Sequence, residues 1–126
     1  MAVTENKGIR SELIPRMATG FCAGTAYTGG MCGAVAGAII ALNLVYGRDD
    51  AGGSKEENYK AVQRFTAGFR SEFGELSCPG LTGVDLGTVK GHKEYTDKNL
   101  HERCAGFVEG ATRIVLELSE KDRSKL

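Results

Sequence analysis

One uncharged stretch constrains the fold of this chain more than any other feature of its sequence. Residues 17–47 contain no Asp, Glu, Lys, Arg or His, whereas the part of the chain that follows is rich in charge. Because charge is scarce in protein cores, we expect this stretch to form the heart of the core or of a subunit interface. A small bundle can bury only part of so long a stretch by itself, so we also expect a homodimer or a higher oligomer.

Two helices are predicted before and within this stretch. Residues 10–21 predict a short helix with Pro15 in or near its first turn, where the missing N–H does little harm. Residues 33–46 predict a second helix that ends at Gly47. Small residues recur at every fourth position of this second helix: Gly33, Gly37 and Ala41. The resulting flat stripe allows another backbone to approach closely.

The charged half predicts two longer helices separated by a loop. Ser54 and Glu57 fit a capping box, and Gly74 follows the helix that they would begin. The apolar stripe of that helix comprises Tyr59, Val62, Phe65, Phe69 and Phe73. Residues 75–87 contain a proline and three glycines and predict an irregular loop. The last helix begins near Asn99, and its apolar face comprises Leu100, Cys104, Phe107, Val108, Ala111, Val115 and Leu118.

Together these elements predict an all-α fold, a small helical bundle with glycine-rich, cysteine-bearing loops. The sequence contains no internal repeat and no linker, so we expect a single domain over residues 1–126, with flexible ends at 1–10 and 122–126. The longest apolar run, residues 33–47, has 15 residues, whereas a membrane-spanning helix needs about 20. We therefore expect this run to be a buried core helix.

The charge balance argues against several classes of partner. Lys plus Arg and Asp plus Glu each total 16, and the chain has no Trp. Without a basic stripe or a platform for base stacking, we expect no nucleic-acid partner. The N-terminus lacks the apolar region of a signal peptide, so we expect a cytoplasmic protein. The C-terminal Ser124, Lys125 and Leu126 match a peroxisomal address, which we interpret as incidental.

The four cysteines are the candidate functional residues. In a chain without a secretion signal, cysteines bind metals or react more often than they form structural disulfides. They are Cys22, Cys32, Cys78 and Cys104, separated by 9, 45 and 25 residues. Zinc and iron–sulfur sites usually contain ligand pairs only about two to four residues apart. The spacing therefore disfavours such a site, unless the four cysteines converge in three dimensions.

Local context distinguishes the cysteines from one another. Cys32 stands at the start of the second predicted helix, where free N–H groups favour a thiolate, although a small buried filler fits there equally well. Cys22 lies across a glycine loop that would allow, without requiring, its approach to Cys32. Cys78 precedes a proline in the predicted loop. Cys104 shares the apolar face of the last helix, which favours a core residue. His101, one turn before it, is interpreted as a solvated or capping histidine.

Several segments, in the same order, resemble one protein family. They are "MATGFCAG", "GGMCGAVAGAIIALNLVYGR", "SCPGLTGVDLGT" and "LHERC". These segments are similar to the redox-active family that is named for its pattern C-GCAxxG-C-C, and the strongest match is "CGAVAG" at residues 32–37. The resemblance implies a bacterial or archaeal protein with a redox function. Some members carry selenocysteine, which suits redox or nucleophilic chemistry better than a structural role.

The resemblance carries over to three of the four family cysteines, which match Cys32, Cys78 and Cys104. Many relatives carry their first cysteine on an N-terminal helical segment well upstream of the glycine loop, and we expect this chain to start too late to hold that segment. Cys22 stands where many relatives have glycine. It either substitutes for the missing thiol or belongs to a subfamily with a different pairing, so the partner of Cys32 stays open.

Three functional hypotheses follow. In the first, the chain is a small redox protein, such as a thiol–disulfide oxidoreductase, that needs no cofactor and exchanges with a partner protein or a small thiol. Cys32 is then the activated nucleophile, Cys22 its resolving partner, and Cys78 with Cys104 a second pair or a relay. In the second, the four cysteines bind a metal ion or an iron–sulfur cluster. In the third, the chain is a non-catalytic oligomeric interaction protein with inert cysteines.

Overall fold

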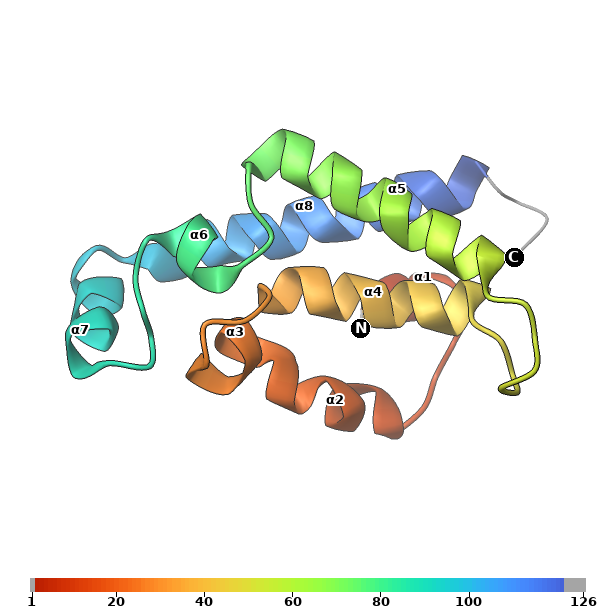
Figure 1. The fold of residues 1–126 in the computed structure, drawn as a ribbon, viewed down its shortest axis with the longest axis horizontal. Helices are drawn as coiled ribbons and strands as arrows, with labels where there is room; N and C mark the ends of the chain where they lie inside the picture. The colour runs from red at the N-terminus through yellow and green to blue at the C-terminus, as the bar shows by residue number, and fades with distance from the viewer. Residues whose placement is uncertain (1, 122–126) are drawn as a thin grey trace.

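The computed structural model describes residues 2–121, and they form the all-α fold predicted from the sequence (Figure 1). Within these residues β-structure is limited to one isolated bridge, between Met31 and Ser77. In chain order the helices are α1 Ala2–Asn6, α2 Leu13–Ala18, the 3₁₀ turn η1 Thr19–Phe21, α3 Cys22–Tyr27, α4 Gly33–Tyr46, α5 Glu56–Phe73, α6 Cys78–Thr82, α7 Val89–Asp97 and α8 Leu100–Lys121. The expected flexible tail at 122–126, with Ser124, Lys125 and Leu126, lies outside the described residues.

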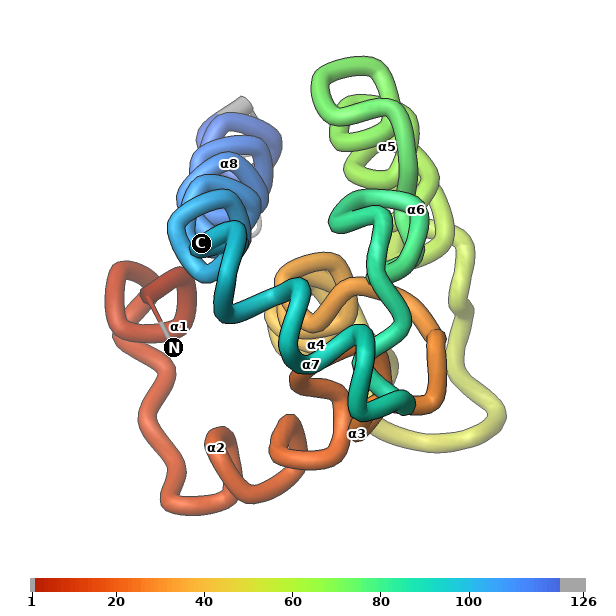
Figure 2. Tube along the Cα trace, turned by 90° about the vertical axis from the view of Figure 1, so that its left-hand side faces the viewer, coloured from red at the N-terminus to blue at the C-terminus, as the bar shows by residue number. Residues whose placement is uncertain are grey.

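The three longest helices, α4, α5 and α8, pack against one another and enclose the core. Helices α5 and α8 lie side by side over α4, while the α2–α3 segment lies on the opposite side of α4 (Figures 1 and 2). The small α1 packs on α8 and α4. None of the helices in residues 2–121 combines the length and the apolar character that crossing a membrane requires.

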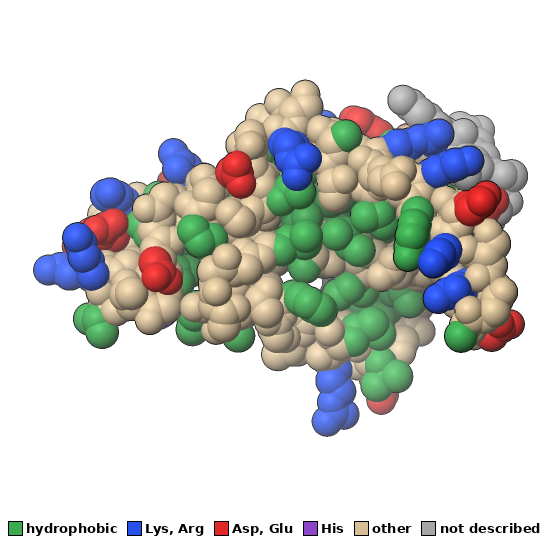
Figure 3. Space-filling model, viewed as in Figure 1, with side chains coloured by type: hydrophobic (Ala, Val, Ile, Leu, Met, Phe, Trp, Pro, Cys, Tyr) green, Lys and Arg blue, Asp and Glu red, His purple; other side chains and the backbone are tan. Residues whose placement is uncertain are grey.

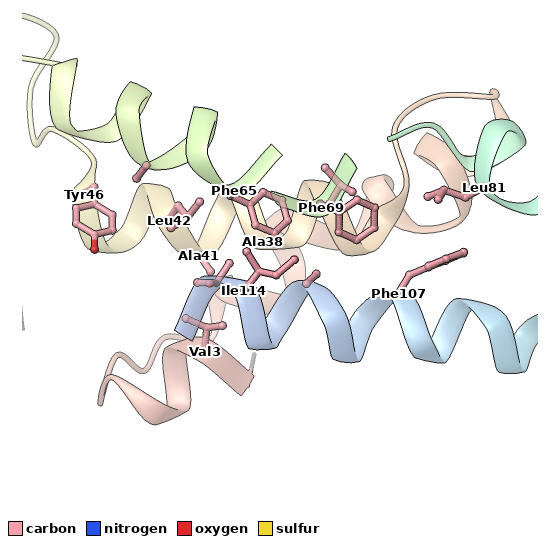
Figure 4. Packing of buried hydrophobic residues seen from close by; sticks show 14 residues of the cluster. Val3, Ala38, Ala41, Leu42, Tyr46, Phe65, Phe69, Leu81, Phe107 and Ile114 are labelled. Carbon is pink, nitrogen blue, oxygen red and sulfur yellow. The ribbon is translucent and has the colours of Figure 1, made fainter. Parts of the chain in front are cut away.

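Aromatic side chains at four-residue spacing explain how α5 faces the core. Phe65 and Phe69 are fully buried, and their ring centroids lie 5.9 Å apart (Figure 4). Phe107 of α8 meets Phe69 at a centroid distance of 6.3 Å. Each fully buried Phe contributes about 1.5–3 kcal/mol to stability. Tyr59, which the sequence placed on the same stripe, is instead 52% exposed and lies outside the core.

The predicted ends of the long helices are confirmed, except at the start of α5. Helix α4 spans the predicted residues and is followed by Gly47, and α5 is followed by Gly74. The helix begins after Lys55, so Ser54 lies one residue before the N-cap position that the sequence assigns to it. The Ser54 hydroxyl instead accepts a hydrogen bond from the Glu56 N–H at 3.4 Å.

The region predicted as the loop 75–87 contains a short helix, α6. The Ser77 side chain caps this helix by accepting a hydrogen bond from the Gly80 N–H at 3.0 Å. Pro79 lies in its first turn, where a backbone donor is not needed, so the residue taken as a helix breaker is tolerated. Helix α7 was also unpredicted, and it begins after Thr88, whose side chain accepts a hydrogen bond from the Gly91 N–H.

The N-terminal segment contributes one short helix to the core. Residues 2–6 form α1, and its Val3 is only 5% exposed. Val3 belongs to the core cluster together with residues of α4, α5 and α8. No sequence pattern predicts this contact, because five residues are too few to reveal helical periodicity.

The most unusual backbone lies in α3, which is a left-handed turn. Ala23, Gly24, Thr25, Ala26 and Tyr27 all have positive φ, between 53° and 69°. Each left-handed L-residue other than glycine costs about 1–2 kcal/mol, so the surroundings must hold this turn in place. The hydrogen bonds that close it include one from the Gly30 N–H to the Gly24 carbonyl at 2.8 Å and one from the Thr28 hydroxyl to the Thr25 carbonyl at 2.6 Å.

Candidate functional site

All four cysteines line one cavity with a volume of about 380 Å³. Each lies in a different helix or directly before one: Cys22 begins α3, Cys32 directly precedes α4, Cys78 begins α6, and Cys104 lies in α8. All four are free thiols. The structure therefore brings the sequence-predicted cysteines together, although up to 82 positions separate them along the chain.

A short backbone pairing places Cys32 next to Cys78. Met31 and Ser77 form an antiparallel bridge, flanked by two hydrogen bonds. The Cys32 N–H donates to the Leu76 carbonyl at 2.8 Å, and the Cys78 N–H donates to the Gly30 carbonyl at 2.9 Å. Cys32 and Cys78 thus occupy diagonal positions on the same face of the pairing, and such positions lie about 7–8 Å apart.

Two glycines allow the segment that carries Cys22 to pack against this pairing. A Cβ atom on Gly24 would lie 2.5 Å from the Cβ of Cys78 and 3.3 Å from its sulfur. A Cβ atom on Gly33 would lie 3.2 Å from the Cα of Cys22. The absence of a side chain at both positions lets the α3 turn approach Cys78 and the first turn of α4.

The exposure of the four thiols differs strongly. Cys22 is exposed, Cys32 and Cys104 are half-buried, and Cys78 is only 8% exposed. We call Cys32, Cys78 and Cys104 the inner thiols and Cys22 the outer thiol. Since reagents and partner proteins reach exposed sulfur most easily, the outer thiol is the accessible entry to the group.

Burial decides the ionisation of Cys32. Removal from water raises the pKa of this thiol, the N–H groups of Ala34 and Val35 lower it, and negative charge on Cys104 raises it further. The net pKa of Cys32 is above its ordinary value, because burial outweighs the lowering by N–H groups that its place at the helix start predicts. The dipole effect is present but smaller than the desolvation, which sequence position alone does not reveal.

The pKa of Cys78 is raised for the same reasons. Burial is the largest cause; the Thr82 hydroxyl lowers the pKa, and negative charges on Cys104 and Cys32 raise it. Cys104 thus acts on both other inner thiols, which identifies the three as neighbours. At neutral pH, Cys32 and Cys78 are therefore protonated.

Tyr95 is a site residue that the sequence did not reveal. It lies on α7, lines the cavity, and its hydroxyl hydrogen-bonds to Cys104. Burial, followed by this bond and the charge on Cys104, raises the pKa of Tyr95 to about 12. Because α7 itself was not predicted, no sequence signal pointed to this tyrosine.

The two histidines take no part in the cavity. His101 and His92 are both exposed, and neither is among the residues that line it. The His92 ring contacts the Tyr27 ring edge-on, with centroids 4.8 Å apart. Within the described part of the chain, no group of three or more His, Cys, Asp or Glu residues is placed so that it could hold a metal ion. The four cysteines share a cavity without forming such a group.

The fold and the cavity define a class: a small all-α protein with several free thiols gathered at one cavity. A family model described as "Putative redox-active protein (C_GCAxxG_C_C)" matches residues 1–118. The chain belongs to this family, as the resemblance in its sequence indicated, and a redox role is the family's described property. No curated protein and no solved structure was found to match the chain.

Proposed function

We propose that the protein stores and transfers two electrons as a disulfide among the inner thiols, with Cys22 as the thiol that meets the redox partner. The observation that carries this proposal is the shared cavity, where one exposed thiol and three neighbouring, less exposed thiols meet. The family description supports a redox role in general.

The proposed sequence begins at the outer thiol. The Cys22 thiolate attacks a disulfide of the partner, which releases one partner thiol and leaves a mixed disulfide. Cys32 then attacks the Cys22 sulfur and releases the second partner thiol. This order reverses the roles predicted from the sequence, because Cys22 is exposed whereas burial raises the pKa of Cys32.

The inner thiols complete the transfer. Cys78 or Cys104 attacks the Cys32 sulfur in the Cys22–Cys32 disulfide, so that an inner disulfide forms and Cys22 is free again. Two electrons and two protons have then passed from two protein thiols to the partner. The role of Tyr95 in this scheme is to hold the Cys104 side chain in place at the cavity through the hydrogen bond of its hydroxyl.

The test is equilibration of the protein in thiol–disulfide buffers of defined potential, followed by alkylation and peptide mass spectrometry. We expect one disulfide per chain between two inner thiols, with Cys22 alkylated. The Cys22→Ser variant should form the same disulfide more slowly. If all four thiols stay free across potentials at which ordinary dithiols oxidise, the proposal fails. A metal or cluster bound after anaerobic purification, shown by a visible spectrum and metal analysis, would favour the second sequence hypothesis instead.

We also propose that the protein is a homodimer and works in the cytoplasm, where free thiols persist. Support for the dimer comes from exposed apolar side chains spaced four residues apart along α2 and η1: Leu13, Met17 and Phe21, which are 58%, 44% and 41% exposed. Hydrophobic side chains also gather along the middle of the face shown in Figure 3. Sedimentation that finds a monomer at working concentration would contradict the dimer, and Met17→Lys should weaken it.

A further inference from the structure

Among residues 2–121, the side chains that line the cysteine cavity carry no formal charge. Within that range, Lys, Arg, Asp, Glu and His are all missing from its lining, although a quarter of the whole chain is charged. Apart from the thiols, its polar side chains are Thr82, Tyr95 and Thr112. The remaining walls are alanine, glycine and larger apolar side chains.

The three hydroxyl groups of the wall already have partners. The Thr82 hydroxyl donates to the Cys78 carbonyl at 2.8 Å, and the Thr112 hydroxyl donates to the Val108 carbonyl at 2.8 Å. The Tyr95 hydroxyl is hydrogen-bonded to Cys104. The part of the wall that residues 2–121 supply therefore offers a charged ligand neither an opposite charge nor a spare hydroxyl donor.

The size and chemistry of the cavity suit a small organic molecule. Its volume of about 380 Å³ is within the range of about 300–1,000 Å³ that is typical of small-molecule sites. A carboxylate or an ammonium group that entered it would lose its water without gaining a partner, which is strongly unfavourable. An uncharged molecule loses little hydration free energy on entry, and it gains contacts with the apolar walls.

We propose that the cavity admits an uncharged, small organic disulfide as its direct oxidant and excludes charged disulfides. This inference rests on the proposed function and specifies its substrate. A thiolate of one inner cysteine attacks one sulfur of the bound disulfide, whose S–S bond breaks and releases one organic thiol. A second inner thiol attacks the mixed disulfide and releases the other organic thiol. The protein loses two electrons and two protons, and the organic disulfide gains them.

The test compares two aromatic disulfides, neutral 2,2′-dithiodipyridine and dianionic 5,5′-dithiobis(2-nitrobenzoate), by stopped-flow absorbance. The Cys22→Ser variant is used so that the outer thiol does not contribute. Each rate is divided by the rate of the same reagent with N-acetylcysteine amide, which removes the intrinsic difference between the reagents. We expect the normalised rate for the neutral disulfide to be at least tenfold higher. Equal normalised rates would overturn the inference.

A charge placed at the cavity tests the cause of the selectivity. Val108 lines the cavity and is 55% exposed, so Val108→Lys adds a cation there without disturbing the core. This change should lower the neutral-to-anionic ratio at least threefold. Val89, which is 90% exposed and is not among the lining residues, provides the matched control, and Val89→Lys should leave the ratio unchanged. A ratio that responds equally to both changes would contradict the proposed site.

The reaction products distinguish a failure of this inference from a failure of the proposed function on which it rests. Two equivalents of released aromatic thiol and one protein disulfide, found by mass spectrometry with the neutral reagent, support both. A protein disulfide formed with equal normalised rates leaves the proposed function standing and removes the selectivity. Mixed disulfides that never resolve overturn the proposed function, and with it the assignment of the cavity as a substrate site.

Discussion

The two halves of the uncharged stretch have similar compositions and opposite structures. Residues 33–46 form the right-handed α4, in which Val35 and Leu42 are fully buried. Residues 17–31 include the left-handed turn of α3 and leave Phe21 and Tyr27 41% and 50% exposed. The absence of charge therefore did not predict burial. The two halves are stabilised differently. Bulky apolar residues at helical spacing pack α4 into the core, whereas backbone hydrogen bonds and close glycine contacts stabilise the α3 turn.

The largest difference between the halves should be the cost of removing an apolar side chain. Leu42→Ala should reduce the free energy of unfolding by about 2–5 kcal/mol, because a fully buried leucine leaves a cavity behind. Tyr27→Ala, in the other half, should cost only about 1 kcal/mol, since that side chain is 50% exposed. Urea unfolding measures both, at a protein concentration that keeps the oligomeric state constant. Equal costs would show that the exposed half is also a folded core.

The same glycine-to-alanine substitution should change the free energy of unfolding in opposite directions in the two halves. Gly24 has a φ of +67° and touches Cys78, so Gly24→Ala should destabilise the fold by roughly 1–3 kcal/mol. It should also speed alkylation of Cys78. Gly37 lies inside α4 with open space around it, so Gly37→Ala should stabilise the fold by about 0.5–1 kcal/mol. A loss of stability in both variants would mean that the left-handed turn is not what makes Gly24 necessary.

A smaller effect should come from relieving the left-handed backbone at an exposed position. Ala26 is exposed and has a φ of +53°, so Ala26→Gly should stabilise the fold by up to about 1 kcal/mol. Ala105 is exposed within the right-handed α8, and Ala105→Gly should cost about 1 kcal/mol. Thermal unfolding of the two variants shows directly whether each substitution raises or lowers the stability of the fold. If Ala26→Gly is destabilising, residues 23–27 are right-handed in solution.

The smallest effect on the free energy of unfolding should come from the ionisation of Cys32 and Cys78, and it should appear at alkaline pH. The raised pKa values of Cys32 and Cys78 mean that the folded protein holds these protons more tightly than the unfolded chain does. Their contribution to stability is fully present below about pH 8.5 and is lost as pH rises through the folded-state pKa values. Unfolding free energies at pH 7 and pH 10 should show this loss. Cys78→Ala should make it smaller, whereas a loss of equal size in the variant would assign it to other groups.

Much of the helical core could be predicted, because it depends on patterns within one segment. The aromatic spacing of α5 and the glycine after it located that helix, and the bounds of α4 were read from its composition. The short helices were missed since their cause is a single cap: Ser77 for α6 and Thr88 for α7. The left-handed α3 could not be predicted either, as alanine and threonine do not favour positive φ.

The sequence predicts which residue types form the candidate site. It does not predict which cysteines are neighbours or how their pKa values shift. Four cysteines in one chain pointed to the thiols, and the helix start pointed to Cys32. The pairing of Met31 with Ser77, which places Cys32 beside Cys78, joins segments 46 positions apart and left no trace in the sequence. The direction of the Cys32 pKa shift depends on how much water the fold removes, which is a property of the packed structure.

Because the four thiols lie far apart along the chain, a disulfide between two of them would change the stability of the fold. A disulfide between Cys32 and Cys78 would close a long loop and restrict the unfolded chain, which is worth about 4 kcal/mol in favour of the folded state. By the thermodynamic cycle, the same free energy lowers the reduction potential of the folded dithiol relative to the unfolded one. At about 30 mV for each 1.4 kcal/mol, the difference is about 90 mV. The melting temperature of this protein would then report its oxidation state.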